Sequence, residues 1–203
     1  MVLTRSIAEG MDISRPPVAE HNGRRLYAME KDDLASIKDW RNAQMNVLRQ
    51  WRPLTDTNQE EWFASLSKDS SQIVFAIRIE IKGKLMLIGY TALVHVDHVN
   101  HRAEVSFLVD PARAANKATY RADMLSALAL LCRYGFEELG LHKIYAETFA
   151  FRKDHVKILE EFGFKRDGVM RGHQLKGSKY HDSILHSILD EEWASIKPRW
   201  FDE

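Results

Sequence analysis

The sequence predicts a mixed α/β (α+β) fold of three layers, in which helices flank a mixed, mostly antiparallel central sheet. Residues 73–81 and 85–94 are rich in branched and aromatic side chains. They are joined by Lys82-Gly83-Lys84, a pattern typical of a β-hairpin. Residues 118–139 carry apolar side chains at helical spacing and are followed by Gly140, which indicates a long amphipathic helix.

The segments before the hairpin are predicted to be mainly helical. Residues 1–24 form a polar N-terminal arm, and a first strand follows at 25–29. Helical spacing of apolar side chains predicts a helix at 31–41 and a short helical piece at 46–51. The run Thr57-Asn58-Gln59-Glu60 has the pattern of a capping box and is expected to begin a further helix.

The segments after the hairpin are expected to be a histidine-rich loop, a strand, the long helix, a strand, a helix and a terminal hairpin. Their predicted ranges are 95–101, 103–109, 118–139, 143–149, 154–162 and, for the two hairpin strands, 169–175 and 183–189. We therefore expect one domain, residues 25–194, followed by a C-terminal tail, residues 195–203.

Composition excludes several classes of function. The chain has 203 residues, and 29 Lys and Arg balance 29 Asp and Glu, so no overall basic field exists to hold nucleic acid. A single cysteine, Cys132, permits no intrachain disulfide and fits a reducing compartment. No secretory signal pattern opens the chain, and no apolar run approaches the ~20 residues of a membrane span. We expect a cytoplasmic protein that binds neither nucleic acid nor a membrane.

Two loops contain residue types that bind ions. Arg113-Ala114-Ala115-Asn116-Lys117-Ala118 leads into the long helix, whose first N–H groups and positive dipole end favour an anion. Small side chains would let the backbone approach a phosphate, whereas the alternative is an ordinary solvated loop. His95, His98 and His101, with Asp97, superficially suggest a metal site. They lie in a predicted hairpin loop without a cysteine partner, so no metal is expected.

Several C-terminal segments together resemble the GNAT N-acetyltransferase superfamily. These are FEELGLHK (136–143), LEEFGF (159–164), KRDGV (165–169) and YHD (180–182), and they are similar to ribosomal-protein N-terminal acetyltransferases. Residues 40–42 (WRN), with Trp62-Phe63 and Ser65-Leu66, resemble the substrate-side helices of amino-sugar nucleotide N-acetyltransferases. The resemblance covers roughly residues 25–194.

The resemblance implies acetyl-CoA as donor and a primary amine as acceptor, with direct acyl transfer. In such folds the strand that contains Phe107, Leu108 and Val109 pairs with the pantetheine arm, and residues 113–118 hold the pyrophosphate. Arg152 stands where the family has an asparagine that contacts CoA. The glycines that are usual in the pyrophosphate loop are replaced here, notably at Ala114 and Asn116. We therefore expect a wider cradle and weaker CoA binding, with Asn116 able to reproduce one glycine at positive φ.

The resemblance also suggests catalytic residues. Glu104 is expected to draw a proton from the amine, directly or through water, and His155 to act as the thiolate acid or as a CoA contact. The position of the family's tyrosine acid is Leu159. The alternatives are an outward strand residue for Glu104 and a surface helix residue for His155.

The acceptor is expected to contact residues from both halves of the chain. These are Trp40, Arg41, Asn42, Trp62, Tyr180 and His181. The alternatives are core packing for the two tryptophans and solvent-facing strand positions for Tyr180 and His181. We expect the acceptor to be a small amine, first of all an amino-sugar nucleotide. The alternatives are a protein N-terminal α-amine and a non-catalytic domain that binds a ligand or partner. The chain is expected to be a monomer or a homodimer.

Overall fold

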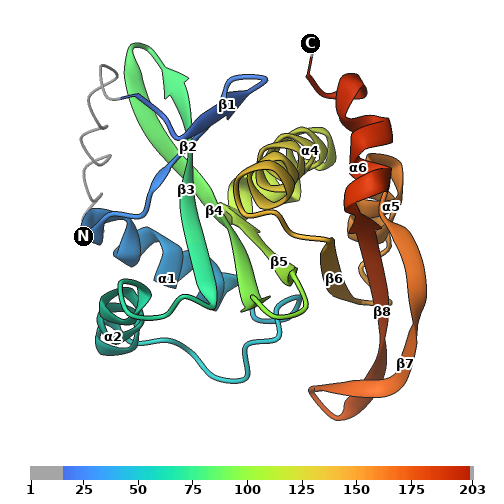
Figure 1. Cartoon of the computed structure of the whole chain (residues 1–203). Helices are drawn as coiled ribbons and strands as arrows, with labels where there is room; N and C mark the ends of the chain where they lie inside the picture. Colours follow the sequence, from blue (N-terminus) through green and yellow to red (C-terminus); the bar gives the residue numbers. More distant parts are fainter. Residues whose placement is uncertain (1–15, 202–203) are drawn as a thin grey trace, which may run out of the picture.

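The computed structural model describes residues 16–201 and contains one eight-stranded sheet in the order β1-β2-β3-β4-β5-β6-β8-β7. Every neighbouring pair is antiparallel except β5 and β6, which are parallel. Helices flank this sheet, so the predicted α/β class with a mixed, mostly antiparallel sheet is confirmed (Figure 1).

The elements follow one another with short connections. The strands are β1 Ala19–His21, β2 Arg24–Ala28, β3 Gln72–Ile81, β4 Lys84–Asp97, β5 Arg102–Val109, β6 Lys143–Phe149, β7 Lys165–Lys176 and β8 Lys179–Leu189. The helices are α1 Leu34–Ala43, α2 Asp56–Leu66, α3 Pro111–Ala115, α4 Lys117–Arg133, α5 Lys153–Phe162 and α6 Asp190–Ile196. Short 3-10 or π turns cover Lys31–Asp33, Tyr134–Glu138 and Lys197–Arg199.

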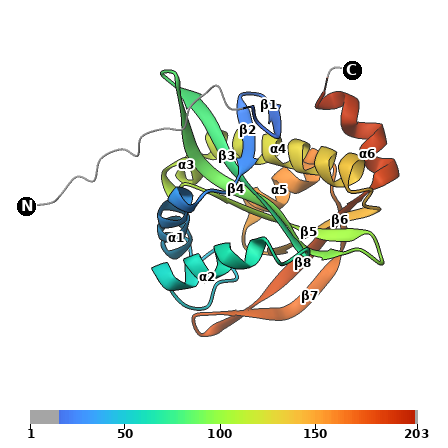
Figure 2. The ribbon, with the colours of Figure 1, turned by 60° about the vertical axis from the view of Figure 1, so that its left-hand side comes forward.

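The two faces of the sheet are covered by different helices (Figure 2). The larger apolar cluster joins the sheet to α4, α5 and α6 and includes Leu128, Leu131 and Phe162, all fully or almost fully buried. The smaller cluster lies under α1 and α2, with Ile37 at its centre and Trp62 at its margin. None of the helices in the described part of the chain is long and apolar enough to cross a membrane.

The sheet separates between β5 and β6. Residues Arg102, Ala103 and Glu104 pair with Lys143, Ile144 and Tyr145, and among the described residues no ladder pair joins the two strands beyond these. In Figure 1 the ribbon accordingly divides into one part with β1–β5 and another with β6–β8. This separation leaves the outer edge of β5 open from Val105 onward.

The structure differs from the predicted elements near both ends of the chain and around α2. The sheet begins at Ala19, inside the predicted arm, and residues 1–15 of that arm lie outside the described residues. Residues 46–51 are irregular and not helical. The cap of α2 is Thr55, whose hydroxyl accepts from the Asn58 N–H at 3.2 Å, so the predicted box was two residues late. Within residues 195–201 of the predicted tail, Ile196, Trp200 and Phe201 pack against the core, and Trp200 stacks on Phe162 with ring centroids 4.7 Å apart.

Candidate active site

A cleft of about 530 Å³ occupies the gap between β5 and β6. Its walls include Ser106 and Phe107 from β5, and Glu147 from β6. The irregular segment 44–55 covers it. Lys176 from the β7–β8 hairpin donates to the carbonyls of Met45 at 2.7 Å and Gln50 at 3.1 Å. This lysine therefore fixes segment 44–55 over the cleft.

A second cavity of about 600 Å³ adjoins the cleft where α3 and α4 face α5. Val47, Arg152 and His155 line both spaces. The second cavity is also lined by Lys117 and Lys153, and its one acidic lining residue among the described residues, Asp154, pairs with Lys117 at 2.8 Å. Three cations against one carboxylate make this end of the passage suitable for an anion.

A third cavity, of about 250 Å³, lies beside the cleft under α1 and α2. Arg41, Tyr90 and Ser106 line both of these spaces. Trp62 and His95 complete this wall, and no Asp or Glu is among the described residues that line it. The three spaces adjoin one another from the start of α4, past the separated strands, to the helices α1 and α2, and together they are called the passage below.

Glu104 lies at the last position of β5 that pairs with β6 and is 3% exposed. One carboxylate oxygen accepts from Arg49, and the other lies 2.9 Å from Nδ1 of His95. Arg49 also donates to Glu147 at 3.0 Å. Both oxygens of Glu104 are therefore engaged, and Glu104 is not among the described residues that line the cavities.

Tyr120, Arg152 and His155 form a polar chain between the first and second cavities. Arg152 donates to the Tyr120 hydroxyl at 2.9 Å, and this hydroxyl lies 2.7 Å from Nδ1 of His155. Burial, with nearby Arg152, holds the pKa of His155 well below its ordinary value of 6.5, so the ring is neutral. A neutral ring with its proton on Nε2 can accept a hydrogen bond from the Tyr120 hydroxyl at Nδ1, and burial raises the pKa of Tyr120 and keeps that hydroxyl protonated.

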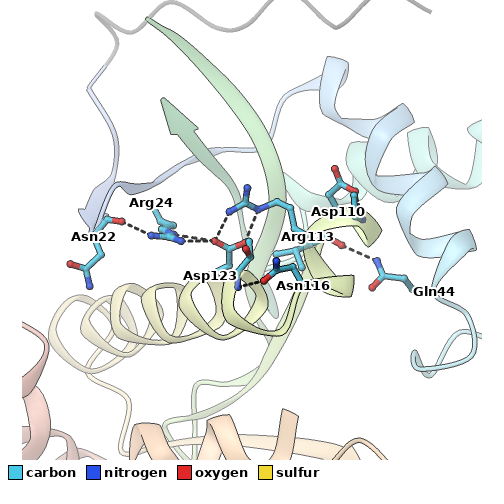
Figure 3. Close-up of polar contacts among 10 residues, drawn as sticks. Asn22, Arg24, Gln44, Asp110, Arg113, Asn116 and Asp123 are labelled. Atoms are coloured by element: carbon cyan, nitrogen blue, oxygen red, sulfur yellow. Dashed lines mark hydrogen bonds and ion pairs between the residues drawn. The ribbon is translucent and has the colours of Figure 1, made fainter. Parts of the chain in front are cut away.

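Arg113 is turned away from this passage. Its Nε and Nη2 donate to the two oxygens of Asp123 at 2.7 and 2.8 Å, and Arg24 donates to the same carboxylate from the other side (Figure 3). Asp123 is fully buried. The expected contact of Arg113 with a phosphate is thus replaced by an internal ion pair, because a buried carboxylate needs cationic partners.

The segment expected to be a phosphate loop is a short helix followed by a cap. Ala114 lies in α3, and Asn116 has φ of −93°, so Asn116 does not reproduce a glycine at positive φ. Its side chain instead accepts from the Thr119 N–H at 3.0 Å and begins α4. Ala114, Ala115 and Lys117 line the second cavity, whereas Asn116 and Ala118 are not among its described lining residues.

The other predicted residues fall into two groups. Phe107, Arg41, Trp62, Arg152 and His155 line the passage. Trp40, Leu108 and Val109 pack against the apolar core. Asn42 forms hydrogen bonds with Leu54 and Gln50, and the His181 ring contacts Phe151. Tyr180 is exposed. The carbonyl of Val109 accepts from Gln44 at 2.8 Å.

Sequence reasoning missed Arg49 and Tyr120, and it did not place His95 in the wall of a cavity. Tyr120 and Arg49 carry no motif, and their partners are 35 and 55 positions away. His95 stood out only through the spacing of its neighbouring histidines. The described residues contain no group of three or more His, Cys, Asp or Glu that could hold a metal ion.

Comparison with known proteins gives concordant results. The family model described as "Acetyltransferase (GNAT) domain" matches residues 26–185. The spermidine N(1)-acetyltransferase of Vibrio cholerae is 26% identical over 173 residues, which are 84% of this chain and 95% of that protein. An uncharacterised N-acetyltransferase of Bacillus subtilis, YnaD, is 24% identical over 162 residues, which are 77% of this chain and 91% of that protein.

A solved structure shares the fold. The crystal structure of the Vibrio cholerae spermidine N-acetyltransferase in complex with CoA and spermine has a TM-score of 0.76 at 23% identity. The likeness covers 85% of this chain and 98% of that one. At this identity, the likeness concerns the arrangement of helices and strands and not the choice of acceptor.

Proposed function

This chain belongs to the GNAT acetyltransferase family, and we propose that it acetylates a small primary amine whose remaining part carries an anionic group. The family uses acetyl-CoA as acetyl donor, so the chain is an acetyl-CoA-dependent N-acetyltransferase. The proposal concerns the acceptor and the residues that bind the two substrates.

The open edge of β5 fits the extended arm of acetyl-CoA. Beyond Glu104 the described part of β6 offers this edge no ladder partner, so peptide groups from Val105 to Phe107 can pair with an added strand-like ligand. The second cavity supplies Lys117, Arg152 and Lys153 for the phosphates, at the start of α4. When bound, acetyl-CoA supplies an acyl group activated as a thioester.

The chain's own residues then position the acceptor amine and polarise the thioester carbonyl. The cleft offers the acceptor nitrogen a space beside β5 that segment 44–55 shelters, and holding the reactants in a fixed geometry accelerates acyl transfer. The β5 backbone supplies N–H groups that can stabilise negative charge on a carbonyl oxygen. Arg152, placed by Tyr120 and His155, stands where the first and second cavities meet.

Arg41 is the residue that supports an anionic group on the acceptor. It lies where the cleft meets the third cavity, and its recorded side-chain hydrogen bond goes to the neutral Gln50 at 3.1 Å. Among the described residues no carboxylate forms an ion pair with Arg41. An arginine without an acidic partner favours a carboxylate or phosphate on the acceptor. An amino-sugar nucleotide meets this requirement.

A polyamine is the second candidate, because relatives named spermidine N-acetyltransferases cover most of this chain. A polycation would need carboxylates beside the reacting nitrogen. Glu147 is the one described carboxylate that lines the cleft, and Arg49 already occupies it. The wall of the passage therefore favours the anion-bearing amine.

A panel of acceptors tests the proposal. The full chain receives saturating acetyl-CoA and, separately, an amino-sugar nucleotide, spermidine or a short peptide with a free N-terminus, while thiol release is measured. We expect the highest kcat/KM for the amino-sugar nucleotide, and a loss of roughly 10- to 100-fold with Arg41→Gln, the range for one charged hydrogen bond. Spermidine as the best acceptor, unaffected by Arg41→Gln, would overturn the proposal. Calorimetric titration that detects no acetyl-CoA binding would favour a non-catalytic domain.

A further inference from the structure

His95 occupies an irregular position in the sheet. The ladder between β4 and β5 runs from Gly89 with Val109 to Val94 with Glu104, then shifts and resumes at Asp97 with Arg102. Two residues of β4, His95 and Val96, therefore stand in the place of one, which is a β-bulge. His95 has φ of +52°, in the left-handed region that non-glycine residues seldom occupy.

The bulge changes the direction of the His95 side chain. Leu93 and Val96 both belong to the larger core cluster and therefore face the same side of the sheet. In a regular strand, residues three positions apart face opposite sides, so one extra residue lies between them. The extra residue brings the His95 ring back across the sheet to Glu104 and into the wall of the third cavity. A bulge that re-aims one side chain towards a cavity is a common feature beside active sites.

Glu104 fixes the chemical state of the ring. The carboxylate oxygen 2.9 Å from Nδ1 can only accept, so a neutral His95 carries its proton on Nδ1. The remaining nitrogen, Nε2, is then the basic one. Glu104 itself is buried among Arg49 and His95, whereas the His95 side chain is 66% exposed and reaches solvent and cavity alike.

We propose that His95 is the base that takes the proton from the acceptor amine, and that Glu104 is the positioning residue that keeps Nε2 of His95 free. This inference rests on the acetyl-transfer function proposed above. The acceptor ammonium gives one proton to Nε2, which passes it to solvent. The nitrogen lone pair then forms a bond to the acyl carbon and the carbon–sulfur bond breaks. The amide nitrogen then loses a second proton, and the departing CoA thiolate takes up one proton, so the products are the amide and the free thiol.

The location of His95 supports this role. It lies on the same cavity wall as Arg41 and Ser106, and both of these also line the cleft where the acyl group is expected. A base must come within hydrogen-bond reach of the proton that it removes, directly or through one water. The charged and titratable groups around the ring and its carboxylate are Glu104, Arg49, Arg41, Tyr145, Asp97 and Arg102.

The kinetic test compares His95, in the bulge of β4, with His98, in the turn that follows β4. His98 lies three residues on and its Nε2 is 3.2 Å from the carbonyl of Ser70, outside the described walls of the passage. With saturating acetyl-CoA and the panel amine that the unaltered chain acetylates fastest, His95→Gln should lower kcat by about 10²–10⁴. The KM for acetyl-CoA should stay unchanged, and His98→Gln should retain normal turnover.

Two further measurements separate chemistry from mere loss of structure. The pH profile of kcat should lose its acidic limb in His95→Gln, and added imidazole should restore part of the turnover of His95→Ala. Normal turnover and an unchanged pH profile in His95→Gln would overturn the proposal while leaving the acetyltransferase function intact.

Which ring nitrogen of neutral His95 carries the proton can be measured without any acceptor. Long-range ¹H–¹⁵N spectra of the full chain should show neutral His95 protonated at Nδ1, and Glu104→Gln should abolish this preference. A ring protonated at Nε2 would overturn the proposal. If no panel amine reacts, the acceptor proposal fails, and this spectrum still decides the role of Glu104 and His95.

Discussion

Arg113 and Asp123 form a two-point ion pair, with Nε–Oδ2 and Nη2–Oδ1 distances of 2.7 and 2.8 Å. The pair connects α3 to the second turn of α4, and Asp123 is fully buried. Because Arg24 binds the same carboxylate from β2, Asp123 joins the N-terminal strands to the region beside the second cavity.

This pair predicts that Arg113 contributes to stability and not to phosphate binding. Arg113→Ala removes one of two cationic partners of a buried carboxylate. It should lower the free energy of unfolding by about 1–3 kcal/mol. The affinity of the folded variant for acetyl-CoA, measured by calorimetry, should stay within about twofold. Lys117→Ala is the matched control, because this exposed side chain lines the second cavity, and it should weaken acetyl-CoA with little loss of stability.

A second prediction concerns the missing glycines. Ala114 is helical and Asn116 has φ of −93°, so neither position needs a glycine. The double variant Ala114→Gly with Asn116→Gly should therefore lose about 1 kcal/mol of stability through backbone entropy and the lost cap. It should not bind acetyl-CoA more tightly. A clear gain in affinity would mean that a glycine loop is the better phosphate cradle in this chain.

The neutral His155 predicts a dependence of stability on pH. Its folded-state pKa lies well below 6.5, so below about pH 6.5 the unfolded chain binds more protons than the folded one. This contribution to stability is complete above pH 6.5 and is lost as the pH falls, by up to about 1.4 kcal/mol per pH unit.

Denaturant unfolding at pH 7 and pH 5 measures the effect. His155→Gln keeps an acceptor for the Tyr120 hydroxyl but cannot titrate, so it should lose less stability than the unaltered chain, by about 2 kcal/mol over this range. His142→Gln is a control at an exposed histidine and should retain the full pH dependence. Equal losses in all three chains would contradict a low pKa for His155.

The contacts of Lys176 predict that its substitution raises the KM for the acceptor more than it changes kcat. Its ammonium donates to the carbonyls of Met45 and Gln50 and lies over the Phe149 ring, with Nζ 5.6 Å from the ring centroid. Lys176→Met keeps the apolar stem but releases segment 44–55. The KM for the acceptor should rise by up to about tenfold, the value of one charged hydrogen bond. Lys179→Met, on the same hairpin, should behave like the unaltered chain, and a fall in kcat alone for Lys176→Met would refute the assigned role.

Local patterns were sufficient for most of the fold. The strand predicted at 143–149 is β6, and the helix predicted at 154–162 is α5 with one more residue at its start. Lys82 and Gly83 form the turn of the β3–β4 hairpin with φ of 51° and 75°. These elements are set by side-chain periodicity and turn chemistry, which act between residues a few positions apart.

The site depended on contacts that no local pattern contains. Residue type alone made Arg113 a candidate for a phosphate, but Asp123 and the distant Arg24 turn it inward. His95 was predicted to be in a loop, yet it lies in a bulged strand whose register with β5 sets its direction.

The sequence by itself determined the class of fold, the family and some of the residues at the passage, because helix and strand periods and short motifs are local properties. Tertiary structure alone decided which charges pair and which remain available to a substrate. Arg49 bridges two carboxylates from different strands, and Lys176 reaches carbonyls 126 and 131 positions away. The reason is physical: a buried charge is stabilised by whichever opposite charge packing brings within a few ångströms, and sequence separation does not enter that energy.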